Sequence, residues 1–425
     1  MNKKLIVCVL MCFGVCVMRC NAQYWRLTHL RSRTDVSLDL NRVYNYNSYE
    51  RNRWGVGFDI LHPLKYDTRF GRNFQNALIG WAYVGYGTGD KAWKYGGSVG
   101  FVFPRNIFNS IIVGYQHDLL RVGSHSFDDY NVFNTSDNSS YFSSHFCSTD
   151  RISVVSQIDI LGPGKFILTY SHSRERYLFD ASGLLYPSIN EDEAMPYMDF
   201  NEAIIDLYWG DHWKFELMSN IVASDDNIWR ITSNPLFALD YIRFLAEYKN
   251  KIDFKNNNGQ LSIFAQGGIV NDDVPVSRRF DLGGTGGGWY YFNNTFLTVR
   301  PNTFMSEAFT LASIRYTMGK GLWKNALSEP RPFVQMSAMW GMLFGKSIEN
   351  GSDYYPLGDN KYITLTAPID GLAEPCLGID GLIHWGVLDM GVAAAYQLTP
   401  KKSPYHLDNF LDKFAVMFVA KLIID

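Results

Sequence analysis

Three residues that could together catalyse ester hydrolysis lie on one predicted strand, residues 109–118. Ser110 offers a hydroxyl nucleophile, His117 a general base and Asp118 a carboxylate to orient the histidine, which are the three roles of a serine hydrolase. Because such partners meet in space and not in sequence, their spacing cannot show a site. Polar side chains near the end of a strand account for the same residues, so we expect that no reaction depends on them.

Arg278 and Arg279 precede a glycine-rich run, residues 283–288. A phosphate-binding loop would need a strand before the run, a helix after it and usually a lysine. The sequence that follows is WYYFNN, an aromatic strand pattern, so we interpret residues 280–298 as a kinked part of the wall. We expect the two arginines to face a lumen and pair with acidic groups; a gating or ligand-binding role is the alternative.

Other charged groups fall in predicted loops or at strand ends. The acidic clusters at 128–129, 191–193 and 272–273 lack the ligand spacing of an EF-hand loop. We interpret them as solvated loop charge, with weak divalent-ion bridging to lipopolysaccharide as the alternative. His172, close to Arg174 and Arg176, ends a strand and enters a loop. The sequence therefore predicts no catalytic residue, no cofactor site and no metal site.

The elements that would position these groups begin after a targeting segment. Residues 1–22 have the organisation of a secretory signal peptide: Lys3 and Lys4, an apolar run at 5–18 and a small-x-small cleavage site at Cys20-Asn21-Ala22. Residues 23–425, taken as the mature chain, hold no apolar run of the ~18 residues that a spanning helix needs. Either an exported soluble protein or a β-barrel is expected.

Composition favours the barrel. Aromatic residues make up 16% of the chain and charged residues 19%, which is below the ~25% typical of soluble domains. The mean hydropathy of -0.13 is compatible with a membrane wall, because only alternate residues of a barrel strand face lipid. A net charge of -3 gives no electrostatic footprint for nucleic acid.

Period-two alternation predicts many antiparallel strands. In the hairpin at residues 83–105, Trp93, Tyr95, Val99 and Phe101 share one face, and Lys94 and Gly96 lie on the other. The remaining strands are predicted at 35–46, 54–62, 76–87, 109–118, 151–161, 165–174, 201–209, 213–220, 236–249, 259–270, 309–318, 333–343, 375–384, 387–397 and 414–424. The fold class is all-β, a single transmembrane antiparallel barrel of about 14–16 strands, whose last strand should pair with the first.

Loops, aromatic residues and cysteines complete the expected picture. The long polar stretches at 123–149 and 179–199 are predicted outside the cell, because short turns face the periplasm in such barrels. Tryptophans and tyrosines near strand ends, among them Trp81 and Tyr83, are expected in interfacial girdles. Four of the six cysteines lie in the signal peptide, and Cys147 and Cys376 are either two free thiols or one bridge.

The run YGTGDKAWKYGGSVGF, with NRVYNYNSYERNRWGVGFDI before it, resembles the barrel of an outer-membrane family of unknown function. That family is common in Bacteroidota and is often fronted by a carboxypeptidase-like regulatory domain. Weaker matches are FDLGGTGGGWYYFNN, EAFTLASIRYTMGKGLW and PCLGIDGLIHWGVLDMGVAAAY. The family is similar in turn to surface-antigen barrels. We expect the chain to depart from it by lacking the soluble N-terminal domain and by having no room for periplasmic modules. The resemblance implies no catalytic residue.

The expected function is that of a non-enzymatic integral protein of the cell outer membrane, in transport or binding or in a surface-antigen-like assembly role. The alternatives are an outer-membrane hydrolase with a site on the barrel wall and a secreted all-β binding module. Expected partners are outer-membrane lipids, lipopolysaccharide and, during insertion, the barrel assembly machinery. No nucleic acid is expected.

Overall fold

The computed structural model describes residues 24–26, 34–39, 42–47, 49–66, 74–103, 107–124, 146–160, 162–178, 197–220, 241–255, 258–271, 274–284, 290–291, 296–300, 303–325, 327–344, 352–358, 361–385 and 388–422. The predicted signal peptide, residues 1–22, lies outside the described residues. So do most of the two long predicted loops and the acidic clusters at 128–129, 191–193 and 272–273.

β-strands dominate the described chain. The first are β1 (Tyr24–Arg26), β2 (Asp35–Asp39), β3 (Tyr44–Asn47), β4 (Arg51–Tyr66), β5 (Phe74–Gly87), β6 (Trp93–Val102), β7 (Phe108–Arg121), β8 (Phe146–Asp159), β9 (Gly164–Leu178), β10 (Met198–Trp209) and β11 (Trp213–Asn220). The others are β12 (Ile242–Phe254), β13 (Gly259–Val270), β14 (Phe280–Asp281), β15 (Tyr290–Tyr291), β16 (Met305–Ser306), β17 (Ala308–Met318), β18 (Arg331–Met342), β19 (Ser352–Gly358), β20 (Lys361–Thr366), β21 (Leu372–Trp385), β22 (Leu388–Tyr396) and β23 (Phe414–Leu422). A 3-10 turn, η5 (Val276–Arg278), precedes β14.

No helix in the described part of the chain is both long and apolar enough to cross a membrane.

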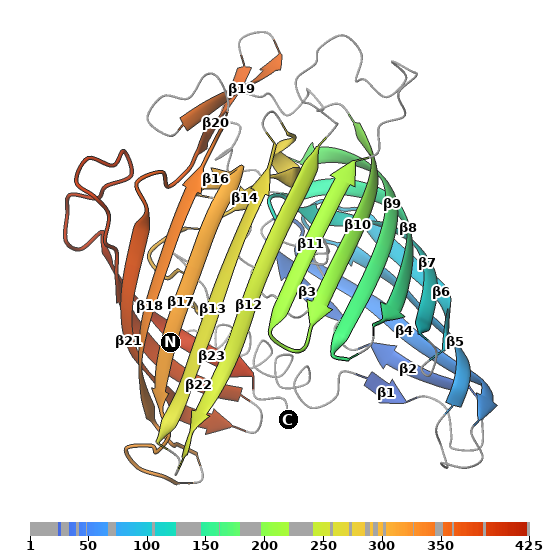
Figure 1. Cartoon of the computed structure of the whole chain (residues 1–425), viewed down its shortest axis with the longest axis horizontal. Coiled ribbons are helices and arrows are strands. Elements are labelled where there is room, and N and C mark those ends of the chain that lie inside the picture. Colours follow the sequence, from blue (N-terminus) through green and yellow to red (C-terminus); the bar gives the residue numbers. More distant parts are fainter. Residues whose placement is uncertain are drawn as a thin grey trace.

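One large antiparallel sheet curls into a barrel (Figure 1). β2 and β3 pair with consecutive parts of β4, so they are two pieces of one interrupted strand. Counted in this way, sixteen strands of the described residues form the wall: β2 with β3, then β4 to β13, β17, β18 and β21 to β23. The predicted all-β antiparallel barrel of about 14–16 strands is therefore confirmed.

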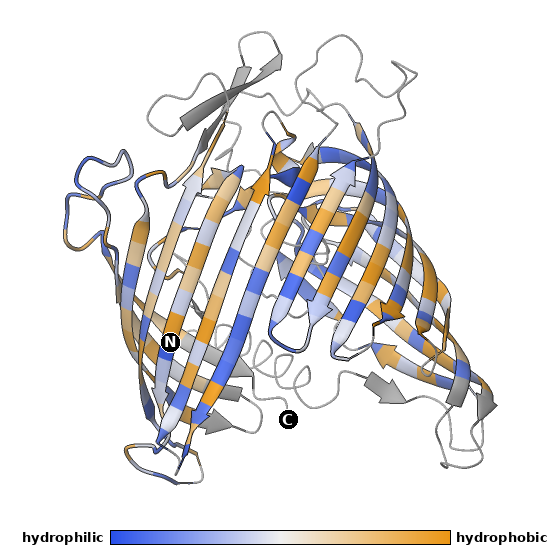
Figure 2. Cartoon of the chain, in the orientation of Figure 1, coloured by the Kyte–Doolittle hydropathy of each residue, from blue (hydrophilic) through white to orange (hydrophobic). Residues whose placement is uncertain are grey.

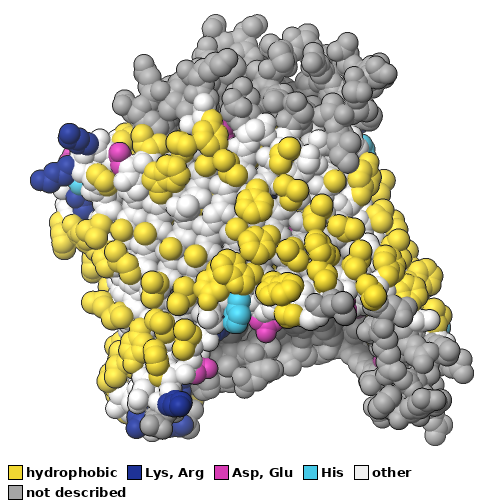
Figure 3. Space-filling view, in the orientation of Figure 1, with side chains coloured by type: hydrophobic (Ala, Val, Ile, Leu, Met, Phe, Trp, Pro, Cys, Tyr) yellow, Lys and Arg dark blue, Asp and Glu magenta, His cyan; other side chains and the backbone are white. Residues whose placement is uncertain are grey.

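Alternate residues of the strands face opposite sides of the wall. Along β17 the buried side chains of Phe309, Leu311 and Arg315 point inward, and the exposed Ile314 and Met318 point outward. Figure 2 shows the resulting alternation of colour along the strands, and Figure 3 shows apolar side chains spread over the outer face. Period two places every second residue on the same face, so one strand supplies both a lipid-type surface and a polar lining.

The two ends of the barrel differ in the length of their connections. The ends that β8 and β9, β10 and β11, and β12 and β13 bring close together in sequence lie at the lower end in Figure 1, and the strand ends that flank the longest connections lie at the upper end. The turn between β5 and β6 belongs to the upper end, because β5 and β7 run in the same direction and β7 leads into a long connection. The predicted contrast between short turns and long loops is confirmed.

The positions of Trp81 and Tyr83 correct the prediction that these residues belong to interfacial girdles. Trp54, Trp93, Trp209, Trp213 and Trp340 are exposed on the outer wall as expected. Trp81 and Tyr83 instead belong to the inward face of β5, where their rings stack and the guanidinium of Arg42 lies 4.3 Å from the ring centre of Tyr83. Outward positions of β5 are occupied by residues such as Val84.

The last strand has an unexpected neighbour. β23 pairs with β22 on one side and, on the other, with the two residues of β15, which run parallel to it. The sequence predicted that the terminal strand pairs with the first strand, which would remove both sheet edges. Within the described residues no ladder joins β23 to β1, β2 or β3. A short piece of the β13–β17 connection covers the edge of β23 instead.

Candidate functional site

The described residues of the connection between β13 and β17 lie against the inner face of the wall. We call this connection, residues 271–307, the plug. Its described side chains are mostly buried, and they form one apolar cluster with inward-facing residues of β10, β12, β17 and β18. The plug members of that cluster are Val274, Val276, Phe280, Leu282, Phe296, Val299, Phe304 and Met305. Burial of this many apolar side chains supplies the main stabilisation of the inward fold.

The plug corrects the prediction that residues 280–298 are a kinked strand of the wall. β14 pairs with β16 in a separate two-stranded sheet, inside the upper part of the barrel in Figure 1. Gly284 lies where two backbone segments meet, since a Cβ there would be 2.1 Å from the carbonyl oxygen of Phe296. From the sequence, a glycine here is attributed to close approach of another backbone segment, and that reason is correct. The approaching segment, however, belongs to the plug itself and not to a strand of the wall. Residues 285–289 lie outside the described residues.

Arg278 fastens one limb of the plug to two neighbouring wall strands. Its Nη1 and Nη2 donate to the Glu175 carboxylate of β9, at 2.9 and 2.7 Å, and its Nε donates to Glu202 Oε1 of β10 at 2.5 Å. The guanidinium also lies 4.1 Å from the ring centre of Phe200. All three charged side chains are fully buried. Such charges are tolerated inside a protein only when paired and hydrogen-bonded, and here they are.

Further polar contacts surround this limb. Arg279 pairs with Glu307 at 2.7 Å, and both side chains are buried. The backbone N–H of Asp281 donates to the carbonyl oxygen of Gly123 at 2.7 Å, and the Asp281 carboxylate lies 3.5 Å from Arg121. The prediction that Arg278 and Arg279 face the lumen and pair with acidic groups is confirmed.

The second limb of the plug reaches a different part of the wall. The backbone N–H groups of Leu297 and Thr298 donate to the Glu374 carboxylate of β21, at 2.9 and 2.8 Å. Leu297 packs in a second apolar cluster with Phe333 and Met417. Five wall strands, β11, β12, β13, β17 and β18, separate β10 from β21. The plug thus spans the lumen between distant strands.

Tyr405, from the connection between β22 and β23, packs against Phe304 near the C-terminal end of the plug. Its ring meets the ring of Phe304 edge to face, with 5.1 Å between centres. The Tyr405 hydroxyl accepts a bond from the backbone N–H of Asp370 at 2.9 Å. Burial raises the pKa of Tyr405, so this hydroxyl stays neutral under ordinary conditions.

The residues that suggested hydrolysis do not meet. Ser110 and Asp118 are buried on the inward face of β7, and His117 lies on the outward face, because odd and even positions of a strand point to opposite sides. Asp118 accepts a hydrogen bond from Arg53 at 2.8 Å and another from the Tyr83 hydroxyl. His117 contacts Asp150 of β8 instead, at 2.7 Å. This geometry does not form a Ser110–His117–Asp118 triad.

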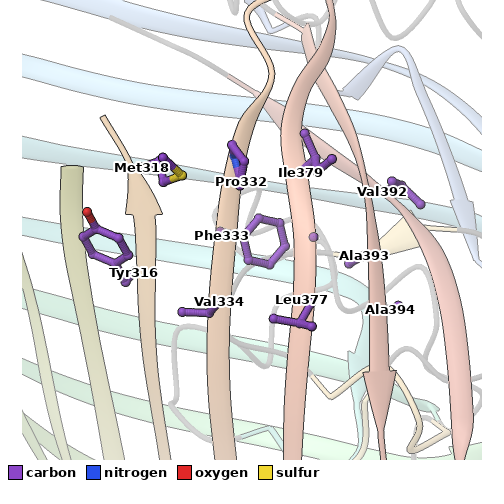
Figure 4. A pocket seen from close by; sticks show the side chains of 11 residues that line it. Tyr316, Met318, Pro332, Phe333, Val334, Leu377, Ile379, Val392, Ala393 and Ala394 are labelled. Atoms are coloured by element: carbon purple, nitrogen blue, oxygen red, sulfur yellow. The ribbon is translucent and has the colours of Figure 1, made fainter. Parts of the chain in front are cut away.

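A hollow of about 520 Å³ opens on the outer wall across β17, β18, β21 and β22 (Figure 4). Exposed side chains of Val334 and Leu377 and the small residues Gly378 and Ala394 line it, and nearly all the lining atoms are apolar. A lining of this kind suits acyl chains and offers little to a polar ligand. We therefore place the candidate site in the lumen, at the plug.

The acidic partners of the plug were missed at the level of sequence. Glu175, Glu202 and Glu374 are charged residues within apolar-polar alternating strands, at inward-facing positions. Alternation alone could have marked them as lumenal, but it could not have named their partners. Among the described residues no group of three or more histidine, cysteine or acidic side chains is placed to hold a metal ion. The absence of a metal or cofactor from the working protein stays a prediction.

No family model matches the sequence, and no curated protein matches it. Solved structures that match include CdiB from Escherichia coli, 8% identical, with a TM-score of 0.46 over 93% of this chain and 63% of that chain. BamA from Haemophilus ducreyi lacking POTRA domains 1-3 is 10% identical, with a TM-score of 0.48 over 92% of this chain and 70% of that chain. CdiB from Acinetobacter baumannii is 9% identical, with a TM-score of 0.42 over 87% and 57%. The chain thus spans less than two thirds of the length of either CdiB protein.

Proposed function

We propose that this chain is an integral outer-membrane protein that transports or binds a cargo through a barrel held shut by its plug. The observation that carries the proposal is the contact of Arg278 with both Glu175 and Glu202, made while the second limb is bound to Glu374. A plug bound to the wall on two sides blocks passage. Transport then requires that these contacts break, and ion pairs with hydrogen bonds have two discrete states, made and broken.

The outer face supports the proposed location in the outer membrane. Exposed apolar side chains occupy outward positions on most wall strands, for example Val99 of β6, Ile152 of β8, Leu217 of β11 and Leu377 of β21. In water such a surface would be an aggregation hazard, whereas in a bilayer it is the expected lipid contact. The protein should fractionate with outer membranes and resist carbonate extraction; recovery from the soluble periplasm would contradict the proposal.

Conductance in planar bilayers tests whether the plug closes the barrel. Wild type should be mostly closed, and Arg278→Met should open often, because Glu175 and Glu202 would lose their shared cation and release the first limb. Arg331→Met is the matched control, since it breaks the exposed pair of Arg331 with Glu329, which measures 2.8 Å. A wild type that conducts as freely as Arg278→Met would contradict the proposal.

The edge of β23 favours a second candidate, a surface-antigen-like role in assembly or export. β15 pairs with β23 over the two positions Tyr290–Phe418 and Tyr291–Val419. Two residues of parallel pairing are easily exchanged for another strand, which is how extended peptides add to open sheet edges. Cysteines introduced at Tyr290 and Phe418, in a chain without Cys147 and Cys376, would lock this edge. If locking leaves export and outer-membrane protein levels unchanged in cells, the edge has no such role.

The absence of enzyme activity is part of the proposal. The one hydrolase arrangement considered from the sequence is split between the two faces of β7, with Ser110 inward and His117 outward. A serine-directed covalent probe should leave the folded protein unlabelled.

A further inference from the structure

The outer wall of β7 to β10 carries a row of ionisable side chains that are not among the plug contacts described above. Cross-strand register aligns His117 of β7 with Asp150 of β8, Asp150 with Arg174 of β9, and Arg174 with Asp199 of β10. We call these four residues the charged row. They face outward, because the residues beside them on the same strands, such as Thr149 and Glu175, are buried toward the lumen.

The charged row lies at the long-loop end of an apolar outer surface. Four residues further down the strands from His117, Asp150 and Arg174, the outward positions are Val113, Val154 and Tyr170. Beyond them come Ile111, Leu168 and Ile205, which are exposed. A change from apolar side chains to tyrosine and then to charge is the order expected where hydrocarbon gives way to lipid headgroups.

Two guanidinium groups are held side by side next to this row. Arg174 and Arg176 are two positions apart on β9, so both point outward. Their Cζ atoms lie 4.8 and 5.1 Å from the ring centre of Tyr197, which therefore contacts both. Asp199 lies 3.7 Å from Arg174, and 58% of the Arg174 side chain is exposed. Asp199 offsets part of the charge of Arg174, and the two guanidiniums on one ring still keep a net positive charge that an added anion would offset.

Histidine and tyrosine groups flank the arginines. The Nδ1 of His117 and the hydroxyl of Tyr115 both contact Asp150, at 2.7 and 2.9 Å, while the Nδ1 of His172 contacts Asn201 at 2.8 Å. These contacts hold His117 and His172 on the same face as the arginines. Tyr197 contacts both guanidiniums and keeps them close together, an arrangement suited to bidentate binding of phosphate.

We propose that Arg174 and Arg176, with Tyr197 between them, form a site for a phosphorylated glycolipid of the outer leaflet. The proposal rests on the outer-membrane location stated above. The phosphate binds the two guanidiniums at headgroup height, and the acyl chains lie along the apolar outward residues of β7 to β10. The positive charge of the arginines and their position next to the apolar surface together favour a phosphorylated lipid. A free phosphate ion would gain nothing from that apolar surface.

Native mass spectrometry of the full chain in detergent tests the site, with bis-phosphorylated lipid A as the probe. Arg174→Gln/Arg176→Gln should lower its affinity about tenfold or more, because two charge-assisted contacts are lost. Lys320→Gln/Lys324→Gln is the matched control, since it removes two exposed positive charges at the opposite end of the barrel. This control should bind as wild type does. Lipid A without phosphate should bind weakly to every variant, and millimolar inorganic phosphate should not compete.

Equal binding of phosphorylated lipid A by wild type and by Arg174→Gln/Arg176→Gln would overturn the site. Equal binding of the phosphorylated and dephosphorylated lipids by wild type would overturn it too. If the double variant does not fold, as judged by heat-modifiable gel migration, Tyr197→Leu replaces it: both charges stay, the shared ring is lost, and affinity should still fall. Recovery of the wild type from the soluble periplasm would contradict the proposed function, whereas a folded outer-membrane barrel with unselective binding would contradict the lipid site alone.

Discussion

Arg278 and Glu175 form a buried two-point ion pair, with Nη1 2.9 Å from Oε2 and Nη2 2.7 Å from Oε1, across 103 positions of the sequence. The pair joins the plug to the wall near the long-connection end of β9. Glu202 of β10 completes the arrangement through the Nε of the same guanidinium. One cation thus compensates two carboxylates, so its loss should cost more than the loss of either carboxylate.

Arg278→Met should lower the free energy of unfolding by about 3–5 kcal/mol, because two buried carboxylates lose their cation. Urea unfolding in lipid vesicles, followed by heat-modifiable gel migration, measures this. Adding Glu175→Gln to Arg278→Met should restore part of the loss, since it removes one unpaired negative charge. The exposed pair of Arg331 and Glu329 sets the scale, as Arg331→Met should cost about 0–1 kcal/mol. Equal losses of unfolding free energy for Arg278→Met and Arg331→Met would contradict a stabilising role of the buried Arg278 ion pairs.

Local patterns in the sequence predicted the wall well. The outward face of β6, with Trp93, Tyr95, Val99 and Phe101, and its inward face, with Lys94 and Gly96, agree with the structure. Alternation is a property of one strand and needs no knowledge of its neighbours. The same pattern could not tell which face of β5 is inward, so Trp81 and Tyr83 were assigned to a girdle although they point into the barrel.

The plug could not be found in this way. Residues 280–298 have the glycine and aromatic content of a strand, and the same composition serves a chain that packs inside a barrel. Long-range contacts distinguish the two. Arg278 contacts Glu175 and Glu202, and Leu297 contacts Glu374, and the partners of each contact are more than 70 positions apart in the sequence. Contacts over such separations leave no periodic trace in one sequence.

Epitope tags test the direction of insertion. Tags at Ser139 and Asn190 should be labelled on intact cells, because the strand ends on both sides of these positions lie at the long-connection end of the barrel. A tag at Asn257, in the short connection between β12 and β13, should be labelled only after permeabilisation. The reverse pattern would show that the barrel is inserted the other way.

The two cysteines of the predicted mature chain should stay reduced. Cys147 and Cys376 are both buried and free, and they belong to different apolar clusters. A maleimide reagent should therefore label the folded protein poorly and label two thiols after unfolding without reductant. A shift in gel migration on reduction, with no labelling before it, would instead indicate a bridge.

His117→Ala should leave the folded barrel intact and change no ester hydrolysis, because its ring faces outward and Ser110 faces the lumen. Hydrolysis of a short-chain nitrophenyl ester by the purified protein measures this, with Ser110→Ala as the paired variant. An activity that both substitutions abolish, in a folded barrel, would revive the hydrolase alternative.

Gly284 decides whether the plug is a packed structural element or a ligand loop. A Cβ at this position would lie 2.1 Å from the carbonyl oxygen of Phe296 and 2.7 Å from that of Val299, and both are backbone atoms that cannot rotate away. Gly284→Ala must therefore separate the two limbs. On β13, a Cβ at Gly267 would have its nearest neighbour at 3.3 Å, so Gly267→Ala is the matched control.

If the plug is packed as described, Gly284→Ala should either reduce the amount of folded barrel in outer membranes or leave a folded barrel that conducts. Both outcomes follow from the same clash: either the plug is needed for the wall to fold, or the wall folds and the plug is displaced. Gly267→Ala should match wild type in abundance and stay closed. A ligand loop leads to a different expectation, because it needs backbone freedom only for binding. Normal abundance together with wild-type closure in Gly284→Ala, measured in the same membranes and bilayers, would reject the packed plug.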